Sequence, residues 1–230
     1  MAPLPDAVQI APSILSADFA ALGDAITAVE PVADLLHVDV MDGHFVPNLT
    51  IGPPVVAAIN RHTSMILDCH LMMTNPGDFL DAFARAGADW VSVHVEVDAT
   101  ADLLKEMRGL GLGAGLAINP ETPYEAIEPW LGQLDHVLVM TVHPGFGGQA
   151  FMSDVVPKLR RIATTVARGE RPVIVEVDGG IDVHTIGQTA AAGARCFVAG
   201  NAVFRAPDPA AAVGDLRRAA ETAIAAEVGG

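Results

Sequence analysis

Short apolar runs, rich in Val, Ile and Leu, recur along the whole chain and are separated by stretches in which polar and apolar residues mix. Within the runs polar residues are rare, a pattern typical of strands that are buried on both faces of a parallel sheet. We therefore expect eight strands, at Val8–Ala11, Leu35–Val40, Met65–Leu71, Trp90–Val95, Ala114–Ile118, His136–Val142, Val173–Val177 and Arg195–Ala199.

The stretches between these runs have the length and polarity of surface helices. Ser16 and Asp18 precede the first as candidate N-caps, and Gly87 and Gly169 follow two others, as glycine often follows a helix. Eight strands that alternate with eight helices predict an α/β fold, a single (β/α)8 TIM barrel over residues 1–230, whose active-site groups gather at the C-terminal strand ends. The clearest helices are predicted at Phe19–Val29, Pro53–Arg61, Asp78–Ala86 and Asp154–Arg168.

Four chemically active side chains fall at the ends of three predicted strands. His37 and Asp39 are separated by one residue and so point to the same face, while His70 and Asp178 end two other strands. Each alone could be a packed histidine or a helix-capping aspartate. Together they form a candidate site for one divalent metal cation, with carboxylates available for proton transfer. Nitrogen and oxygen ligands suit Zn, Fe(II), Mn or Co, and the spacing does not choose among them.

Strand parity adds further residues to this face. Asp68 shares a face with His70, and Glu176 shares one with Asp178, so both carboxylates are candidates for orienting a ligating histidine from below. A slip in register would instead turn them toward a helix or solvent. Three methionines near the strand ends are either ordinary core residues or a polarizable wall that shields a reactive intermediate from water. They are Met41, Met72 and Met140.

Glycine-rich loops follow three predicted strands in the second half of the chain. Glycine lets backbone N–H groups approach an anion closely, and barrel enzymes often bind phosphate after the seventh and eighth strands. The loops are HPGFGGQ (His143–Gln149), DGGI (Asp178–Ile181) and AGNAVF (Ala199–Phe204). The candidate phosphate contacts are Gly147, Gly148, Gly179, Gly180, Gly200 and Asn201.

Other conspicuous residues have ordinary interpretations. A second glycine cluster precedes a strand and lacks the spacing of a dinucleotide-binding motif, so we interpret it as a turn on the face that serves stability. His94 and Glu96 end the fourth strand and could approach the site. The glycine cluster is Gly109, Gly111, Gly113 and Gly115, and the residues interpreted as structural are His62, His136, His184, Cys69 and Cys196.

Composition narrows the classes of partner. The formal net charge of −15 argues against nucleic acid and against an anionic membrane surface. No apolar run reaches the roughly 18 residues of a membrane-spanning helix. Two cysteines cannot form a disulfide framework, and the opening residues MAPLPDAVQI lack the pattern of a signal peptide. We therefore expect a cytoplasmic protein with a small-molecule substrate.

Six motifs together resemble the ribulose-phosphate 3-epimerase family, in the family's order and over nearly the whole chain. The resemblance implies an isomerase that interconverts D-ribulose 5-phosphate and D-xylulose 5-phosphate, in the pentose phosphate pathway or the Calvin cycle, and a homo-oligomer, either a dimer or a hexamer. The motifs are IAPSILSADF (Ile10–Phe19), HVDVMDGHFVPNLTIGP (His37–Pro53), DCHLM (Asp68–Met72), MTVHPGFGGQ (Met140–Gln149), VDGGI (Val177–Ile181) and AGNAVF.

By this resemblance the family's metal ligands fall on His37, Asp39, His70 and Asp178, and its acid–base pair on Asp39 and Asp178. Ser13 and His70 match residues that contact the sugar, and the three methionines match the family's cap over the intermediate. Asn201 departs from a common serine, and His143 from a frequent asparagine or glutamate. Further contacts to the substrate are implied for Gly145, Phe146, Gly147, Gly148, Asp178, Gly179, Gly180, Gly200 and Asn201.

The predicted mechanism is proton transfer at C3 through a metal-stabilised enediolate, with one aspartate on each face of the sugar. An allulose-6-phosphate 3-epimerase and a non-catalytic phosphate- or metal-binding barrel remain alternatives. A metal-free triose-type isomerase is disfavoured because its usual lysine and glutamate are replaced by histidines and aspartates. A Schiff-base aldolase is disfavoured because Lys105 and Lys158 fall in predicted helices. The loop at Phe45–Thr50 is either a lid or a subunit contact.

Overall fold

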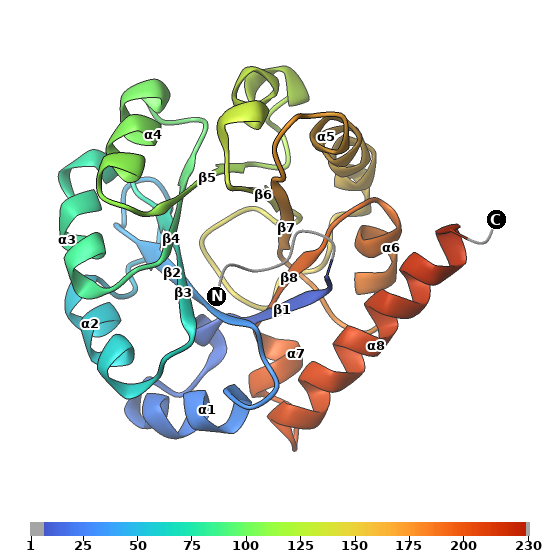
Figure 1. Ribbon diagram of the computed structural model, residues 1–230. Coiled ribbons are helices and arrows are strands. Elements are labelled where there is room, and N and C mark those ends of the chain that lie inside the picture. The colour runs from blue at the N-terminus through green and yellow to red at the C-terminus, as the bar shows by residue number, and fades with distance from the viewer. Residues whose placement is uncertain (1–6, 229–230) are drawn as a thin grey trace.

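Eight parallel strands surround a central axis in the computed structural model, which describes residues 7–228 (Figure 1). Neighbouring strands follow the order β1-β8-β7-β6-β5-β4-β3-β2. A parallel bridge between Ser13 and His37 joins the two end strands, so the barrel is nearly closed. The strands are β1 (Gln9–Pro12), β2 (Leu35–Met41), β3 (Ile66–Met72), β4 (Trp90–His94), β5 (Gly113–Ile118), β6 (His136–Met140), β7 (Ile174–Asp178) and β8 (Cys196–Ala199).

Helices cover the outside of this barrel, which confirms the predicted (β/α)8 fold (Figure 1). Prolines open α2 and α5, where the missing N–H groups would have no partner in the helix. Gly87 ends α3 in a left-handed conformation that glycine adopts without steric cost. The α-helices are α1 (Leu22–Val29), α2 (Pro53–His62), α3 (Leu80–Ala86), α4 (Thr100–Gly109), α5 (Val156–Ala167), α6 (Ile186–Ala191), α7 (Asn201–Phe204) and α8 (Pro209–Val228).

The regular alternation of strands and helices is wrong at one connection. Between β5 and β6 the chain forms only two 3-10 helices, η4 (Tyr124–Ala126) and η5 (Glu128–Gln133). Three prolines in this segment remove backbone donors and clash with a continuing α-helix. They are Pro120, Pro123 and Pro129. After β8 the chain instead forms two helices, α7 and α8.

Three predicted helices also begin later than expected, among them the one predicted from Asp154, which starts at Val156. The first starts at Leu22, after the 3-10 helix η2 (Phe19–Ala21), and the third starts at Leu80, after the 3-10 helix η3 (Pro76–Asp78). Asp18 caps η2, since its side chain accepts a hydrogen bond from the Ala20 N–H. The expected cap residue is therefore correct, but it caps a different type of helix.

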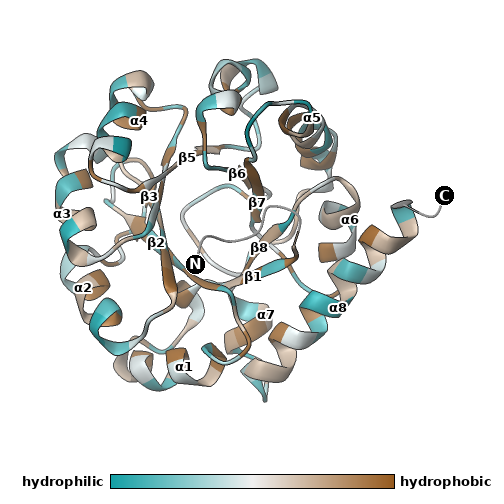
Figure 2. Ribbon diagram, in the orientation of Figure 1, coloured by the Kyte–Doolittle hydropathy of each residue, from teal (hydrophilic) through white to brown (hydrophobic). Residues whose placement is uncertain are grey.

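Alternate strand residues divide the molecule into an apolar shell and a more polar centre. Outward-facing residues such as Val38, Val40 and Leu71 join the large apolar cluster under the helices. In Figure 2 most strands are largely brown (hydrophobic), whereas the helices mix brown with teal (hydrophilic) residues. The intervening residues face the barrel interior, and they include the charged residues of the predicted site. Strand periodicity thus places the site inside the barrel.

The described helices include none that is long and apolar enough to cross a membrane. Cys69 and Cys196 are buried free thiols. Residues 1–6, on which the expectation of no signal peptide mainly rests, lie outside the described part of the chain.

The second glycine cluster makes room for two rings, the buried His136 and the half-buried Trp90. Gly111 has a positive φ of 78° in the turn after α4, as expected, but Gly113 and Gly115 belong to β5 itself. The rings of Trp90 and His136 stack with centroids 4.9 Å apart. A Cβ added to Gly115 would lie 2.1 Å from His136 Nε2, and one added to Gly113 would lie 2.5 Å from the Trp90 ring. These glycines therefore serve packing at the barrel centre.

We expect Gly115→Ala to lower the free energy of unfolding by about 1–3 kcal/mol, because the buried His136 ring has to move. Urea denaturation followed by circular dichroism measures the change. Gly132→Ala is the matched control, since nothing lies within 4 Å of its added Cβ. Equal stability of the two variants would contradict the proposed packing role of Gly115.

Candidate active site and metal centre

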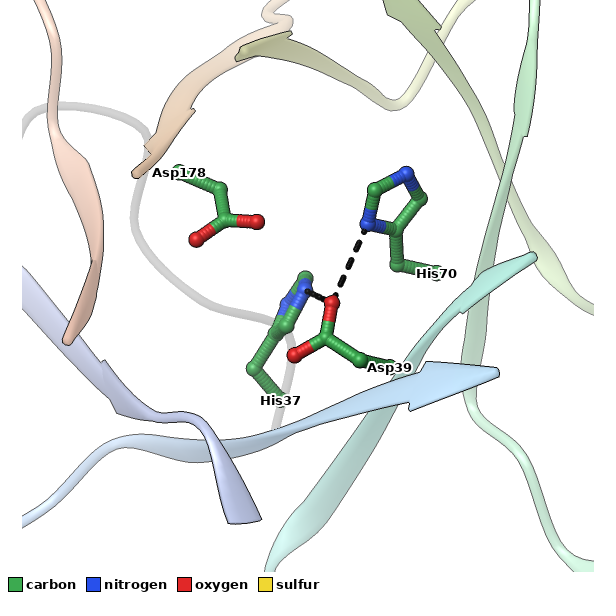
Figure 3. Close-up of side chains that lie close together, drawn as sticks. All are labelled: His37, Asp39, His70 and Asp178. Atoms are coloured by element: carbon green, nitrogen blue, oxygen red, sulfur yellow. Dashed lines mark hydrogen bonds and ion pairs between the residues drawn. The ribbon is translucent and has the colours of Figure 1, made fainter. Parts of the chain in front are cut away.

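The side chains of His37, Asp39, His70 and Asp178 point toward one another inside the C-terminal mouth of the barrel (Figure 3). One ligand atom from each lies within 4.8 Å of the others. The first two come from β2, His70 comes from β3 and Asp178 is the last residue of β7. The structure therefore brings together all four residues that the sequence places at strand ends, and their role as metal ligands stays a prediction.

Asp39 is the centre of the hydrogen-bond network. Its Oδ1 lies 3.4 Å from His37 Nε2 and 3.3 Å from His70 Nδ1, and its Oδ2 accepts a hydrogen bond of 2.5 Å from the Ser13 hydroxyl. Burial opposes ionisation of Asp39, but the charge of the neighbouring His37 holds its pKa well below the usual range. Asp39 is therefore a carboxylate at neutral pH.

Asp178 is in the opposite situation. Burial and the neighbouring negative charge of Asp39 raise the pKa of Asp178 to about 7. In the metal-free chain at neutral pH, one of the two aspartates is ionised while the other is partly protonated. An acid and a base in one site require this difference in protonation.

His37 is oriented by a buried carboxylate. Its Nδ1 lies 2.6 Å from Asp68 Oδ2, and its buried Nε2 has no hydrogen-bond partner among the described residues. Burial opposes protonation, but the charges of Asp39 and Asp68 raise the pKa of His37. A metal ion would therefore displace a proton from Nε2 and occupy the position that this orphaned atom faces. The residues present fit a divalent cation bound by nitrogen and oxygen.

The inward direction predicted for Asp68 and Glu176 is correct. Glu176 Oε1 lies 3.7 Å from His37 Nδ1 and accepts a hydrogen bond from the Cys196 thiol. Burial and the charge of Asp68 raise the pKa of Glu176. Cys196 thus has a polar partner at the barrel centre, in addition to packing there.

A cavity of about 380 Å³ opens above the cluster. Asp39 and Asp178 line it, whereas His37 and His70 are fully buried beneath it. Phe146 lies at its mouth and is 55% exposed. The other predicted site residues that line the cavity are Ser13, Met41, Met72, Met140, Gly145, Gly147, Gly148, Gly179, Gly180, Gly200 and Asn201. The three methionines therefore line the same cavity as the two aspartates, and their shielding role stays a prediction.

The three glycine-rich loops converge on the same cavity. Gly148 has a positive φ of 77°, and a Cβ there would lie 2.4 Å from Asn201 Nδ2. A Cβ on Gly200 would lie 2.4 Å from the Ser16 hydroxyl. The described residues that line the cavity include no lysine or arginine. An anion bound here would be held by backbone N–H groups and small polar side chains.

Ser16 is a cavity residue that sequence reasoning missed. We expected it to cap a helix, but it lies at the end of η1 (Ile14–Ser16) and faces the glycine loops. Its place in the loop after the first strand, next to Ser13, is the signal that could have identified it. His143, the other departure from the family pattern, pairs with Glu121 on the surface, at 3.3 Å.

The loop at Phe45–Thr50 contacts the loop after β6. The Asn48 amide donates a hydrogen bond of 2.8 Å to the Gly145 carbonyl, across the mouth of the cavity. Whether this loop acts as a lid or as a subunit contact stays a prediction. Lys105 lies in α4 and Lys158 in α5, as expected, and neither lines the cavity.

Paired aspartates and histidines at the strand ends, beneath glycine loops suited to an anion, define a (β/α)8-barrel enzyme. Comparison with known proteins shows which family this barrel belongs to. A family model described as "Ribulose-phosphate 3 epimerase family" matches residues 9–204. The chain belongs to this family.

Curated relatives agree with this assignment. The chain is 51% identical over 215 residues to the ribulose-phosphate 3-epimerase of Mycobacterium bovis, with 93% of each chain covered. It is 47% identical over 216 residues to that of Bacillus subtilis, with 91% of this chain and 98% of the relative covered. The similarity thus extends over almost the full length of both relatives.

Solved structures of more distant proteins share the fold. The 3-hexulose-6-phosphate synthase of Salmonella typhimurium superimposes with a TM-score of 0.70 at 17% identity, covering 94% of this chain and 100% of that one. KGPDC from Streptococcus mutans gives a TM-score of 0.71 at 15% identity, covering 94% and 99%. At such identities these structures support the barrel fold alone.

We expect Asp68→Asn to weaken zinc binding about 10-fold or more, because the loss of charge leaves His37 less basic and less firmly oriented. Calorimetric titration of the metal-free protein with Zn²⁺ measures the affinity. Asp24→Asn, at an exposed position in α1, is the control and should bind as the unmodified chain does. Unchanged affinity in Asp68→Asn would refute the orienting role.

Proposed function

We propose that this protein is a ribulose-phosphate 3-epimerase, an isomerase that interconverts D-ribulose 5-phosphate and D-xylulose 5-phosphate. The observation that carries the proposal is the meeting of Asp39 and Asp178 at the floor of one cavity, in a chain of this family. Inversion at a carbon next to a carbonyl needs a proton acceptor on one face and a proton donor on the other. Two aspartates from different strands can supply them.

The two aspartates reach the cavity from separate parts of its wall. On the shorter way round the barrel, β1 and β8 lie between β2 and β7. A sugar that lies between the two side chains presents one face of C3 to Asp39 and the other to Asp178. The ionised aspartate removes the C3 proton, and the protonated aspartate delivers a proton to the opposite face. Because the reaction is reversible, the roles exchange with its direction.

A divalent cation completes the proposed site. His37 Nε2, His70 Nδ1 and one oxygen each from Asp39 and Asp178 would hold it, and Zn, Fe(II), Mn and Co all suit these ligands. When bound, the cation supplies Lewis-acid stabilisation of negative charge on the substrate oxygens. Ser13 holds Asp39 by its hydrogen bond, and the three methionines exclude water from the aspartates.

The phosphate of the substrate would lie against the glycine loops. Gly148, Gly180 and Gly200 line the cavity with backbone that carries no side chain, and the Asn201 amide adds a donor. This places the sugar's other end over the aspartates. We propose a cytoplasmic homo-oligomer, a dimer or a hexamer, in the pentose phosphate pathway or the Calvin cycle, on the resemblance to the family.

We expect Asp39→Asn and Asp178→Asn each to reduce kcat by about 10²–10⁴-fold, because each removes one partner in proton transfer. Coupled assays of xylulose 5-phosphate formation measure the rate, and circular dichroism checks that the fold is retained. Asp24→Asn is again the matched control. A near-normal rate in either active-site variant would contradict the two-base scheme.

Deuterium incorporation at C3 tests the reaction itself. In heavy water, NMR should show exchange at C3 of D-ribulose 5-phosphate together with formation of xylulose 5-phosphate. Exchange should stop after chelation and return with added Zn²⁺ or Mn²⁺. Exchange that survives complete removal of metal would support the epimerase activity but contradict the metal centre. Exchange with allulose 6-phosphate alone would change the assigned substrate.

A further inference from the structure

A third histidine lies directly behind the proposed metal centre. His94 is the last residue of β4, and its fully buried Nε2 lies 2.8 Å from His70 Nε2. Two imidazole nitrogens at this distance share one proton, so one ring donates and the other accepts. The direction of this bond determines which nitrogen of His70 remains free to bind a metal.

Glu96 sets the direction. Its Oε2 lies 3.1 Å from His94 Nδ1. Burial opposes ionisation of Glu96, but the hydrogen bonds it accepts, first from His94, lower its pKa to about 2. An ionised carboxylate only accepts hydrogen bonds, so His94 Nδ1 carries the proton. A neutral His94 then has its lone pair on Nε2.

The consequence for His70 is a defined tautomer. Because His94 Nε2 accepts, His70 Nε2 must donate, and the lone pair of His70 is left on Nδ1. Nδ1 is the atom that faces Asp39 Oδ1, at 3.3 Å. In the opposite arrangement Nδ1 would carry a hydrogen and could not bind a metal.

We propose that His94 and Glu96 are positioning residues that hold His70 in its metal-binding tautomer. The inference rests on the metal centre of the proposed function. It gives a role to the two residues that lie behind His70. His37 is held directly by Asp68, whereas His70 is held through a relay of two residues.

The outer end of the relay is anchored to the barrel wall. The Asn119 N–H donates to Glu96 Oε1 at 2.9 Å, and the Asn119 carbonyl accepts a hydrogen bond of 2.5 Å from Lys158 of α5. On the inner side the Phe45 ring packs against His94, with centroids 4.5 Å apart. These contacts fix the Glu96 carboxylate and the His94 ring.

The tautomers can be measured without metal or substrate. Long-range ¹H–¹⁵N correlation spectra of the metal-free protein, assigned with His70→Gln and His94→Phe, distinguish the two neutral forms of each ring. We expect the Nδ1–H form for His94 and the Nε2–H form for His70. The Nδ1–H form for His70 would overturn the proposal.

Metal affinity supplies the second test. His94→Phe keeps a ring against Phe45 but removes both nitrogens, and Glu96→Ala removes the acceptor. We expect each to weaken Zn²⁺ binding by about 10–100-fold. Glu96→Gln keeps an oxygen that can accept the Nδ1 proton and should restore most of the affinity. Glu106→Gln, an exposed position on α4, should change nothing.

The outcomes separate this inference from the proposed function. Circular dichroism of the metal-free variants checks that the fold is kept, and Glu96→Ala provides the test if His94→Phe does not fold. Wild-type affinity in a folded variant overturns the relay and leaves the metal centre in place. If the unmodified chain binds no divalent metal, the result contradicts the metal centre and, with it, the positioning role of His94 and Glu96.

Discussion

The parallel register between β2 and β3 is the constraint on which the site depends. It pairs Asp39 with His70 and His37 with Asp68, so all four side chains face the barrel interior together. A slip of one residue would turn them outward, into the apolar shell formed by residues such as Val38. Packing of apolar side chains under the helices therefore fixes the position of the polar side chains inside.

This arrangement places many ionisable groups where water does not reach. Burying a charge is unfavourable unless it is paired, and removing one partner is more damaging than never having had the pair. Here Asp68 accepts from His37, and Asp39 accepts from the Ser13 hydroxyl and lies 3.4 Å from the His37 imidazole. The polar centre is tolerable because each group is held by another, and the same contacts give each group a fixed direction.

Local periodicity explains which parts of the site could be predicted from the sequence. Because strand side chains alternate with a period of two, parity alone placed Asp68 and Glu176 in the interior. The end of the fourth strand indicates that His94 could approach the site. Its contact with His70 could not be predicted, because the register pairs His70 with Ser92 and the stagger between β3 and β4 leaves no trace in either strand. The missing helix between β5 and β6 is indicated by prolines such as Pro123, which interrupt a helix whatever the alternation of strands and helices predicts.

The charge balance of the cavity links the two ends of the substrate site. The whole chain has a formal charge of −15, and two aspartates lie at the cavity floor, yet the proposed substrate is an anion. One divalent cation would offset the negative charge of the aspartates that hold it, because the two imidazoles that bind it are neutral. The glycine loops then need to offset only the phosphate, which backbone N–H groups can do without a lysine or arginine. The tautomers of His37 and His70 thus bear on electrostatics as well as geometry, because only neutral rings with correctly placed lone pairs give this balance.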